Sequence, residues 1–308
     1  MTVSDDVLAK EFSTHRTHLI GVAYRLTSTV SDAEDAVQEA WLRLSGLNDR
    51  KRAEIRDLRG WLTTVVGRIC LDRLRSAVAQ RERYVGPWLP EPIVTPYGAP
   101  ASDDPLETVV RDEQVRLAAL VVLDKLTPEQ RVAFVLHDAF SVPFAEIGEI
   151  LGVPEATARQ HASRGRRAAA DSEPPALSDI AEQHAIVERL LTAIVQGDLD
   201  DVVALLHPDA VFIGDSNGKA RTARRHIVGA DKISRFLFGL AEVYGVDRLA
   251  FGEPVLVNGE IGVLIPDVPA EGERWEITRR VSVFEIADGR VTRIYDIANP
   301  DKLTRVSR

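Results

Sequence analysis

The stretch FAEIGEILGVPEATARQHASRGRR, residues 144–167, decides how the first half of this chain folds. Apolar residues at helical spacing predict one short helix that ends at Leu151 and a second helix that begins near Pro154. Gly152 suits the positive φ that a tight turn between them needs. Gly148 has no side chain and so leaves room where the helices cross. Two short helices joined by such a turn are typical of a helix-turn-helix.

The outer face of the second helix is basic. Ala158 and Ala162 are expected to face the core, which turns the polar side chains of this helix outward. Arginine forks suit guanine edges and phosphates, and glutamine suits adenine. We therefore expect this face to bind DNA through Ala156, Arg159, Gln160, Ser163, Arg164 and Arg167. The plainer alternative is an ordinary helical hairpin with a basic end.

The composition places this site in an acidic protein of ordinary globular type. The chain has 308 residues, a net charge of −9 and 45% hydrophobic residues, so several domains are expected and any nucleic-acid site must be local. Cys70 is the one cysteine, and a buried small side chain is favoured over a redox sensor. The N-terminal residues lack a secretory pattern and no apolar run reaches a membrane span, which predicts a cytoplasmic protein with no membrane partner.

Residues 5–27 and the stretch STVSDAEDAVQEAWLRL at 28–44 show helical periodicity. Ser31 and Glu34 form a capping-box pattern at the start of the second helix. The face opposite its apolar stripe is acidic. By itself this face is equally typical of a solvated helix surface.

Residues 50–83 are basic, with ten Lys and Arg against four Asp and Glu. A core stripe within this stretch leaves a second face of aromatic, hydroxyl and basic side chains, which suits a phosphate backbone with unstacked bases. That face consists of Trp61, Thr63, Thr64, Arg68 and Arg75, with Asp72. The alternative is a helix whose arginines extend from the core to solvent.

Residues 84–105 hold six of the 16 prolines and predict a semi-rigid linker that is neither helix nor strand. Trp88 and Leu89 are unusual in a solvated linker, so we expect them to dock on a neighbouring surface. Helical signals resume at Leu106, and Thr127 with Gln130 forms a second capping box.

The order of these motifs resembles the two conserved regions of bacterial extracytoplasmic-function sigma factors. The resemblance rests on DAEDAVQEAWLRL, RGWLTTVVGRICLDRLRSA and LTPEQRVAFVLHDAFSVPFAEIGEILGVPEATARQHASRGRR, and covers about residues 6–170. It implies that the helix-turn-helix reads the −35 promoter element and contacts the β flap of RNA polymerase, and that the basic helix reads the −10 element. It also implies contact between the acidic helix and the β′ clamp, through Asp32, Asp35, Gln38, Glu39, Trp41 and Leu42.

The second half of the chain is of a different class. A break is expected around 171–179, followed by two helices, a strand and a further helix. The pattern then alternates with a period of two, and Asn258-Gly259 and Asp288-Gly289 mark two β-hairpins. Helices followed by antiparallel strands predict an α+β domain.

LLTAIVQGDLDDVVALLHPDAVF, residues 190–212, resembles the start of SnoaL-like domains, which are cone-shaped. A sigma factor that carries such a domain resembles the SigJ-type group, in which WLPEP, GDSNGKA and NPDKL are further fitting patterns. GDSNGKA departs from the more glycine-rich form associated with that group. We expect these patterns to meet at an interdomain junction, formed by Trp88, Leu89, Pro90, Asp215, Lys219, Asn299, Pro300, Asp301 and Leu303.

The predicted fold is therefore multidomain, with two all-α sigma modules and an α+β SnoaL-like cone. The predicted segments are region 2 at 6–83, the linker at 84–105, the region 4 helix-turn-helix at 106–170 and the SnoaL-like domain at 180–308. The resemblance further suggests that the last domain acts in cis, in place of a separate anti-sigma factor.

An enzymatic second half is not favoured. Some relatives of the domain use an acid–base pair, and the candidates here are Asp215, His226, Tyr295 and Asp296, but nothing in their spacing indicates that they converge. No motif indicates a metal or another cofactor. The expected partners are RNA polymerase core, promoter DNA and a small-molecule ligand in the C-terminal pocket. Two alternatives stay open: a one-component helix-turn-helix regulator with a ligand-sensing domain, and a SnoaL-like enzyme tethered to DNA.

Overall fold

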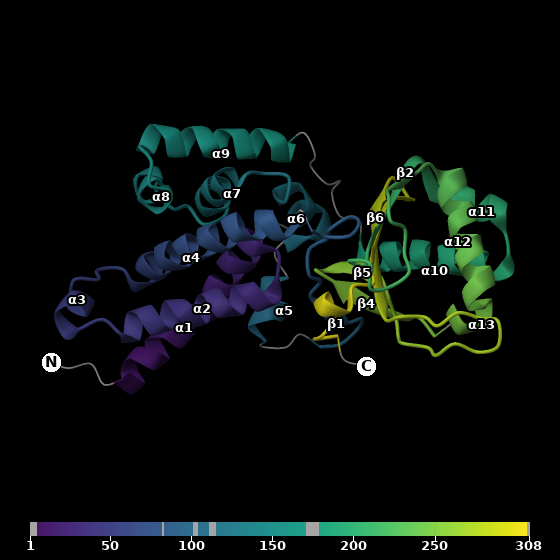
Figure 1. Ribbon diagram of the computed structural model, residues 1–308, viewed down its shortest axis with the longest axis horizontal. Helices are drawn as coiled ribbons and strands as arrows, with labels where there is room; N and C mark the ends of the chain where they lie inside the picture. Colours follow the sequence, from purple (N-terminus) through teal and green to yellow (C-terminus); the bar gives the residue numbers. More distant parts are fainter. Residues whose placement is uncertain are drawn as a thin grey trace. The chain divides into compact units, whose positions relative to one another are not determined.

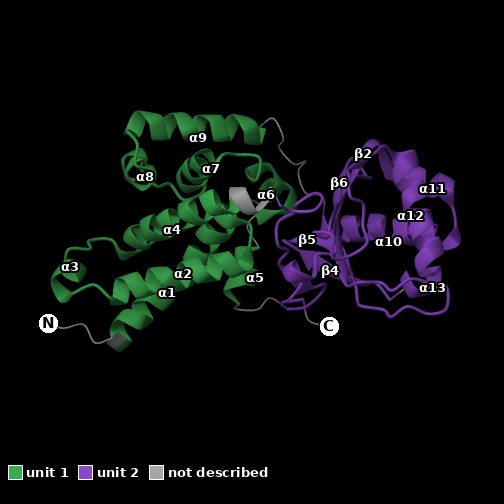
Figure 2. Cartoon of the chain, viewed as in Figure 1, with its two compact units in different colours: residues 1–82, 101–173 green, residues 83–100, 174–308 purple. Residues whose placement is uncertain are grey.

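The computed structural model describes residues 5–81, 83–100, 104–110, 115–170, 179–249 and 251–306. The chain forms two compact units (Figure 2). The helical unit contains residues 1–82 and 101–173, and the α/β unit contains residues 83–100 and 174–308. Most of the predicted linker thus belongs to the α/β unit. Its residues 101–103, and residues 171–178 of the break predicted at 171–179, lie outside the described residues.

The helical unit is built from helices of both predicted sigma modules. In chain order these are α1 (Asp5–Thr27), α2 (Val30–Ser45), α3 (Asp49–Ala53), α4 (Leu58–Arg81), α5 (Pro105–Val109), α6 (Leu117–Leu123), α7 (Pro128–Phe134), the π-helical turn η2 (Val135–Ala139), α8 (Phe144–Leu151) and α9 (Glu155–Ala170). Helices α1, α2 and α4 pack together and bury apolar side chains such as Leu19, Leu44 and Leu62 completely.

Of the two capping boxes predicted from the sequence, one is present in the structure. The capping box of Thr127 and Gln130 is confirmed at the start of α7. The predicted box of Ser31 and Glu34 is wrong, because α2 begins earlier, at Val30. The hydroxyl of Thr29 precedes the helix and donates to the carboxylate of Asp32 at 2.6 Å.

The helix-turn-helix is confirmed in α8 and α9. Gly152 adopts a φ of +70° between the two helices, the left-handed conformation that favours glycine. A Cβ on Gly148 would lie 2.8 Å from the carbonyl oxygen of Val153, so only glycine allows this close crossing. Ala158 and Ala162 are completely buried, as the apolar pattern predicts.

The two helical segments pack against each other within the helical unit. Arg131 of α7 is 1% exposed, and its guanidinium donates to the Arg25 carbonyl oxygen at 2.9 Å and to the Ser28 hydroxyl at 2.5 Å. On α4, a Cβ at Gly67 would lie 3.1 Å from a methyl group of Leu136, so the helices approach closely there. A buried hydrogen-bonded cation and close packing therefore join regions 2 and 4.

The α/β unit has one seven-stranded sheet in the order β1-β4-β5-β6-β7-β2-β3. Its pairs are antiparallel except β2 with β7, which is parallel. Helices α10, α11 and α12 cover one face of the sheet (Figure 1). The elements are α10 (Ile180–Gln196), α11 (Leu199–Leu205), β2 (Leu206–Asp215), β3 (Ile227–Val228), α12 (Ala230–Tyr244), α13 (Val246–Leu249), β4 (Glu253–Val257), β5 (Glu260–Ile265), β6 (Arg280–Ala287), β7 (Arg290–Ile297) and the 3₁₀ turn η3 (Pro300–Lys302).

Both predicted hairpins are confirmed. Asn258 and Gly259 have φ values of +52° and +82° between β4 and β5, and Asp288 and Gly289 have φ values of +51° and +72° between β6 and β7. Two successive residues with positive φ form the turn that matches the twist of paired strands.

The prediction that the linker contains no strand is wrong. Val94–Pro96 forms β1, which pairs antiparallel with β4 at the edge of the sheet. An edge strand tolerates Pro96 because one side of such a strand makes no ladder hydrogen bonds. None of the helices in the described part of the chain combines the length and the apolar character that a membrane span requires.

Candidate functional site

The outer face of α9 carries the six residues expected to bind DNA. All six are exposed: Ala156, Arg159, Gln160, Ser163, Arg164 and Arg167. Four of them line a shallow surface depression together with Glu155. Arg159 donates to Glu155 at 2.8 Å, and its guanidinium lies 5.1 Å from the ring centroid of Phe144. The outer face of α9 is thus accessible to solvent, and the Arg159 side chain is positioned by contacts at the surface.

The polar face of α4, unlike the outer face of α9, is bonded to other helices of the helical unit. Arg75 donates to Glu129 through two guanidinium nitrogens at 3.0 and 3.1 Å, and Glu129 belongs to region 4. Arg68 donates to the carbonyl oxygen of Glu149, also in region 4, at 3.4 Å. Trp61 and Thr64 are half-buried. Two of the residues expected at the −10 element therefore bind α7 and α8 in this structure.

Thr63 departs from the prediction of an exposed residue, because its side chain is 4% exposed. Its hydroxyl lies 2.9 Å from Nε2 of His18 and donates to the carbonyl oxygen of Arg59. Arg59 also donates to Nδ1 of His18 at 3.0 Å, so Nδ1 must be the acceptor and the ring is neutral. Burial, followed by the charge of Arg59, lowers the pKa of His18 to about 4.

The acidic face of α2 presents charged and apolar groups together. Asp32 and Asp35 contact Arg73 at 2.9 and 3.6 Å, and Glu39 pairs with Arg43. Trp41 packs on Phe12 with the ring centroids 5.1 Å apart, and Gln38 is exposed. Leu42 is 61% exposed, which is unusual for a leucine in a folded unit. Cys70 lies on the neighbouring helix and is fully buried, and burial raises the pKa of its thiol to about 12.

In the α/β unit, the linker is held by a buried cluster that we call the linker clamp: Tyr84, Leu89, Asp215, Asn299 and Lys302. The Asp215 carboxylate is completely buried. It accepts hydrogen bonds from the Leu89 backbone N–H at 2.7 Å, from Lys302 Nζ at 2.6 Å and from the Tyr84 hydroxyl. Lys302 also donates to the Leu89 carbonyl oxygen, and the Asn299 amide donates to the Tyr84 hydroxyl at 2.8 Å.

Aromatic contacts and charge complete the clamp. Lys302 Nζ lies 4.0 Å from the ring centroid of Trp88, and burial, followed by the bond to Asp215, raises the pKa of Tyr84 above its usual range. A second junction lies along the linker, where Ile93 and Asn258 exchange hydrogen bonds at 3.0 and 2.9 Å. Tyr97 stacks on His184 with the ring centroids 4.8 Å apart.

The structure brings most of the predicted junction residues to this place. Asp215 and Asn299 belong to the clamp, Leu89 and Pro90 are buried, and Trp88 is half-buried. Lys219 and Asp301, which are close in sequence to Asp215 and Asn299, form an exposed ion pair. Pro300 is exposed and Leu303 is buried.

Two clamp residues were missed by sequence reasoning. Lys302 lies inside the quoted NPDKL pattern, but lysines are so often exposed that its burial gave no signal. Tyr84 is the first residue of the predicted linker, and its partner Asp215 is distant in sequence, so only the fold reveals the pair.

The four acid–base candidates do not converge. Asp215 belongs to the linker clamp, and His226 is exposed. Tyr295 is bonded to Glu285 at 3.2 Å, whereas the next residue, Asp296, faces a cavity between the helices and the sheet. In the part of the chain that the structure describes, no cluster of His, Cys, Asp or Glu has a metal-binding arrangement.

Comparisons with known proteins agree with this architecture. Residues 12–80 match the family model of sigma-70 region 2, residues 116–168 match sigma-70 region 4, and residues 187–294 match the SnoaL-like domain. The ECF RNA polymerase sigma factor SigJ of Mycobacterium tuberculosis is 51% identical over 96% of this chain and 92% of its own length. SigI of the same species, described as a probable ECF sigma factor, is 34% identical over 74% of this chain and 75% of its own.

A solved structure leads to the same conclusion. The crystal structure of M. tuberculosis SigJ matches this fold with a TM-score of 0.80 and 49% identity, over 96% of this chain and 98% of that one. The predicted multidomain architecture of two sigma regions and a SnoaL-like domain is confirmed. The chain belongs to the extracytoplasmic-function sigma factors of the sigma-70 family, with a fused SnoaL-like domain.

Proposed function

We propose that this sigma factor brings RNA polymerase core to its promoters through the three outer surfaces of the helical unit, and that the α/β unit regulates it in cis through the linker. The observation that carries the regulatory part is the linker clamp, in which a segment between regions 2 and 4 is bound by buried charges of the SnoaL-like unit.

The proposed −35 contact is the outer face of α9. Arg159, Gln160 and Arg164 extend from the side of the helix opposite the buried Ala158 and Ala162. The ion pair between Arg159 and Glu155 is solvent-exposed and contributes little to the free energy of folding, so promoter phosphates and bases can replace it. Region 4 also contacts the β flap in this proposal.

The proposed −10 contact is the polar face of α4, with Trp61, Thr64, Arg68 and Arg75. Thr63 joins them only after its hydroxyl leaves His18. Because Arg68 and Arg75 bind region 4 here, promoter binding through them requires regions 2 and 4 to separate. Those two ion pairs are exposed and weak, whereas buried Arg131 provides the stronger restraint on separation.

The proposed contact with the β′ clamp is the acidic face of α2. Asp32, Asp35, Gln38 and Glu39 supply polar groups beside Trp41 and the exposed Leu42. An exposed leucine within a charged rim is the composition of a protein-binding surface, where an apolar centre is surrounded by polar groups.

The linker clamp gives the α/β unit control over the connection between regions 2 and 4. Residues 83–100 are held along the clamp and strand β1. If released, this segment spans up to about 60 Å when fully extended. A docked linker therefore limits how far the two DNA-binding regions can separate, and its release changes the arrangements that the sigma factor can adopt.

The cavity of the α/β unit is the proposed place for a small-molecule ligand. His184, which lines the cavity, also stacks on Tyr97 of the docked linker, so an occupant lies close to the regulated segment. We assign the unit a regulatory rather than a catalytic role, because its acid–base candidates lie in separate environments.

Run-off transcription with purified core polymerase tests the proposal. Full-length protein is expected to bind core enzyme and to direct transcripts from a cognate promoter. A protein that binds the promoter but neither binds core enzyme nor directs transcripts is a one-component regulator and contradicts the proposal. For alanine variants of Arg159, Gln160 and Arg164, the matched control is Arg166→Ala. Arg166 also lies on α9 but outside the proposed set, and it pairs with Asp138.

A further inference from the structure

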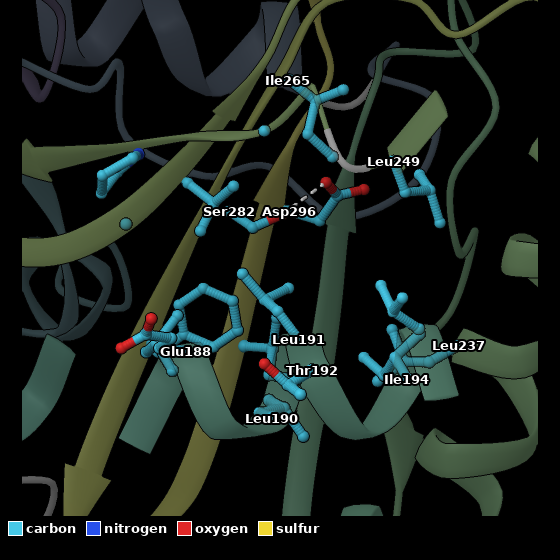
Figure 3. A pocket seen from close by; sticks show the side chains of 18 of the residues that line it. Glu188, Leu190, Leu191, Thr192, Ile194, Leu237, Leu249, Ile265, Ser282 and Asp296 are labelled. Carbon is cyan, nitrogen blue, oxygen red and sulfur yellow. Dashed lines mark hydrogen bonds between the residues drawn. The ribbon is translucent and has the colours of Figure 1, made fainter. Parts of the chain in front are cut away.

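The α/β unit contains a cavity of about 480 Å³ between α10, α12 and the sheet. This volume lies within the range of about 300–1,000 Å³ that small-molecule sites occupy. Its walls are mainly apolar, with Leu190, Leu191, Ile194, Leu237 and Phe284 among them. Figure 3 shows Leu190, Leu191, Ile194 and Leu237 across the cavity from Ser282 and Asp296.

The polar end of the cavity is rich in hydrogen-bond acceptors. Asp296 is 2% exposed, and its Oδ1 atom accepts one hydrogen bond, from the Ser282 hydroxyl at 3.2 Å (Figure 3). Its Oδ2 atom accepts from Thr222 at 2.5 Å and from Arg280 at 3.4 Å. A carboxylate oxygen can accept two hydrogen bonds, and a hydroxyl that donates one can still accept another. Oδ1 of Asp296 and Oγ of Ser282 can therefore each accept a bond from a ligand.

Arg280 offers little to an anion. Its remaining nitrogens donate to the carbonyl oxygens of Arg221 at 2.9 Å and Thr278 at 3.4 Å, and to the Tyr244 hydroxyl at 3.5 Å. Its charge is balanced by Asp296 within a buried pair. An anionic ligand would bring a second negative charge to Asp296 without a free guanidinium edge to bind it. A cationic ligand would lose its hydration beside a carboxylate that Arg280 already balances.

From these contacts we propose that the cavity binds a neutral, mainly apolar small molecule whose hydroxyl group donates to Asp296, or whose primary amide group donates to both Asp296 and Ser282. The inference rests on the proposed ligand-binding role of this unit and adds the chemical class of the ligand. The apolar body fills the space between Leu190 and Leu237, and the donor group satisfies the acceptors at the end of the cavity.

A set of probes with one shared body tests this class in titrations of the full-length protein. The probes are 4-cyclohexylphenol, 4-cyclohexylbenzamide, phenylcyclohexane, 4-cyclohexylbenzoate and 4-cyclohexylbenzylamine, each followed by calorimetry or ligand-observed NMR. A donor bonded to a buried carboxylate is expected to make the phenol and the benzamide bind about tenfold more tightly than phenylcyclohexane. The benzoate and the protonated amine are expected to bind more weakly than the phenol.

Two variants locate the binding. Leu191→Trp fills the cavity from a position that is 36% exposed, so it should fold and should abolish binding of the phenol. Leu199→Trp, at a 40% exposed position outside the lining, is the matched control and should bind the phenol normally. Asp296→Asn should reduce the preference for the phenol over phenylcyclohexane in whatever fraction of the variant remains folded.

The outcomes separate this inference from the proposed function. Equal binding of the phenol and phenylcyclohexane, or tighter binding of either charged probe, overturns the ligand class while leaving a small-molecule site. Binding that persists in Leu191→Trp overturns the location. Failure of all five probes to bind overturns the class as well, whereas regulation through the linker is judged separately, by transcription.

Discussion

Charged side chains are used differently on the outer helices of the helical unit and at the linker clamp of the α/β unit. On α2, α4 and α9 the ion pairs are partly or largely exposed, as with Arg75 and Glu129 or Arg159 and Glu155. In the linker clamp, Asp215 and Lys302 are both buried and bonded to the linker backbone. Exposed pairs contribute little and exchange readily for polymerase or DNA, whereas a buried pair strongly resists the loss of one partner.

The largest expected effect is at the linker clamp. Lys302→Met leaves the carboxylate of Asp215 buried without its cation, which should destabilise the α/β unit by about 3–5 kcal/mol. Amide hydrogen exchange of residues 84–97 should accelerate together with this loss, as measured by mass spectrometry. Lys232→Met, at an exposed lysine of α12, is the control. Unchanged exchange at the Leu89 amide in Lys302→Met would show that the buried pair does not hold the linker.

The next effect concerns base recognition by α9. Replacing Arg159, Gln160 or Arg164 by alanine should cost about 1–3 kcal/mol of promoter binding for each base-contacting side chain and relax preference at one position. Stability should change little, because these side chains are exposed. Binding to a panel of promoter mutants measures the change. If all three variants keep the base preference of the unchanged protein, α9 does not read the −35 element as proposed.

A smaller effect on stability, paired with a large effect on association, is expected at α2. Reversing the charges of Asp35 and Glu39 should change the free energy of unfolding by no more than about 1 kcal/mol, because Asp35 is exposed and Glu39 is half-buried. Competition for core polymerase should be weakened strongly. Glu54→Lys, at an exposed acidic position of the same unit, is the control. Full competition by the double reversal would contradict the assignment of this face.

A pH dependence of stability is expected from His18. Its pKa is lowered from 6.5 to about 4 in the folded state, so the unfolded state binds more protons between these values. The stability of the helical unit should therefore be fully present above pH 6.5 and fall as the pH drops towards 4. Denaturant unfolding at pH 7, 6 and 5 should show a shallower decrease for His18→Gln than for the original chain. An equal decrease in both proteins would mean that His18 is not the titrating group.

Local sequence signals predicted the parts of the molecule that depend on neighbouring residues. The positive φ of Gly152, the capping box at Thr127 and the Asn258-Gly259 hairpin follow from residue chemistry at each point. The start of α2 was mispredicted by the same kind of signal, since Thr29 rather than Ser31 precedes the helix. Periodicity also identified the exposed side of α9 correctly.

Features that depend on distant contacts were less accessible from the sequence. Strand β1 forms because the edge of β4 is available to Val94–Pro96, and a proline-rich composition does not reveal such a partner. Thr63 is buried beside His18 of α1 and Arg59 at the start of α4, and both residues contact its hydroxyl or its histidine partner. Asp215 and Asn299 were placed at a junction by sequence patterns, but their bonding to Tyr84 and Lys302 required the fold.

Run-off transcription at equal protein concentrations measures directly whether the α/β unit regulates the sigma regions by holding the linker. The comparison sets the full chain beside Lys302→Met, the control Lys232→Met and a truncation that lacks residues 180–308. We expect Lys302→Met and the truncation to shift promoter-directed output in the same direction, while Lys232→Met leaves it unchanged. Identical output from all four proteins would contradict regulation through the linker.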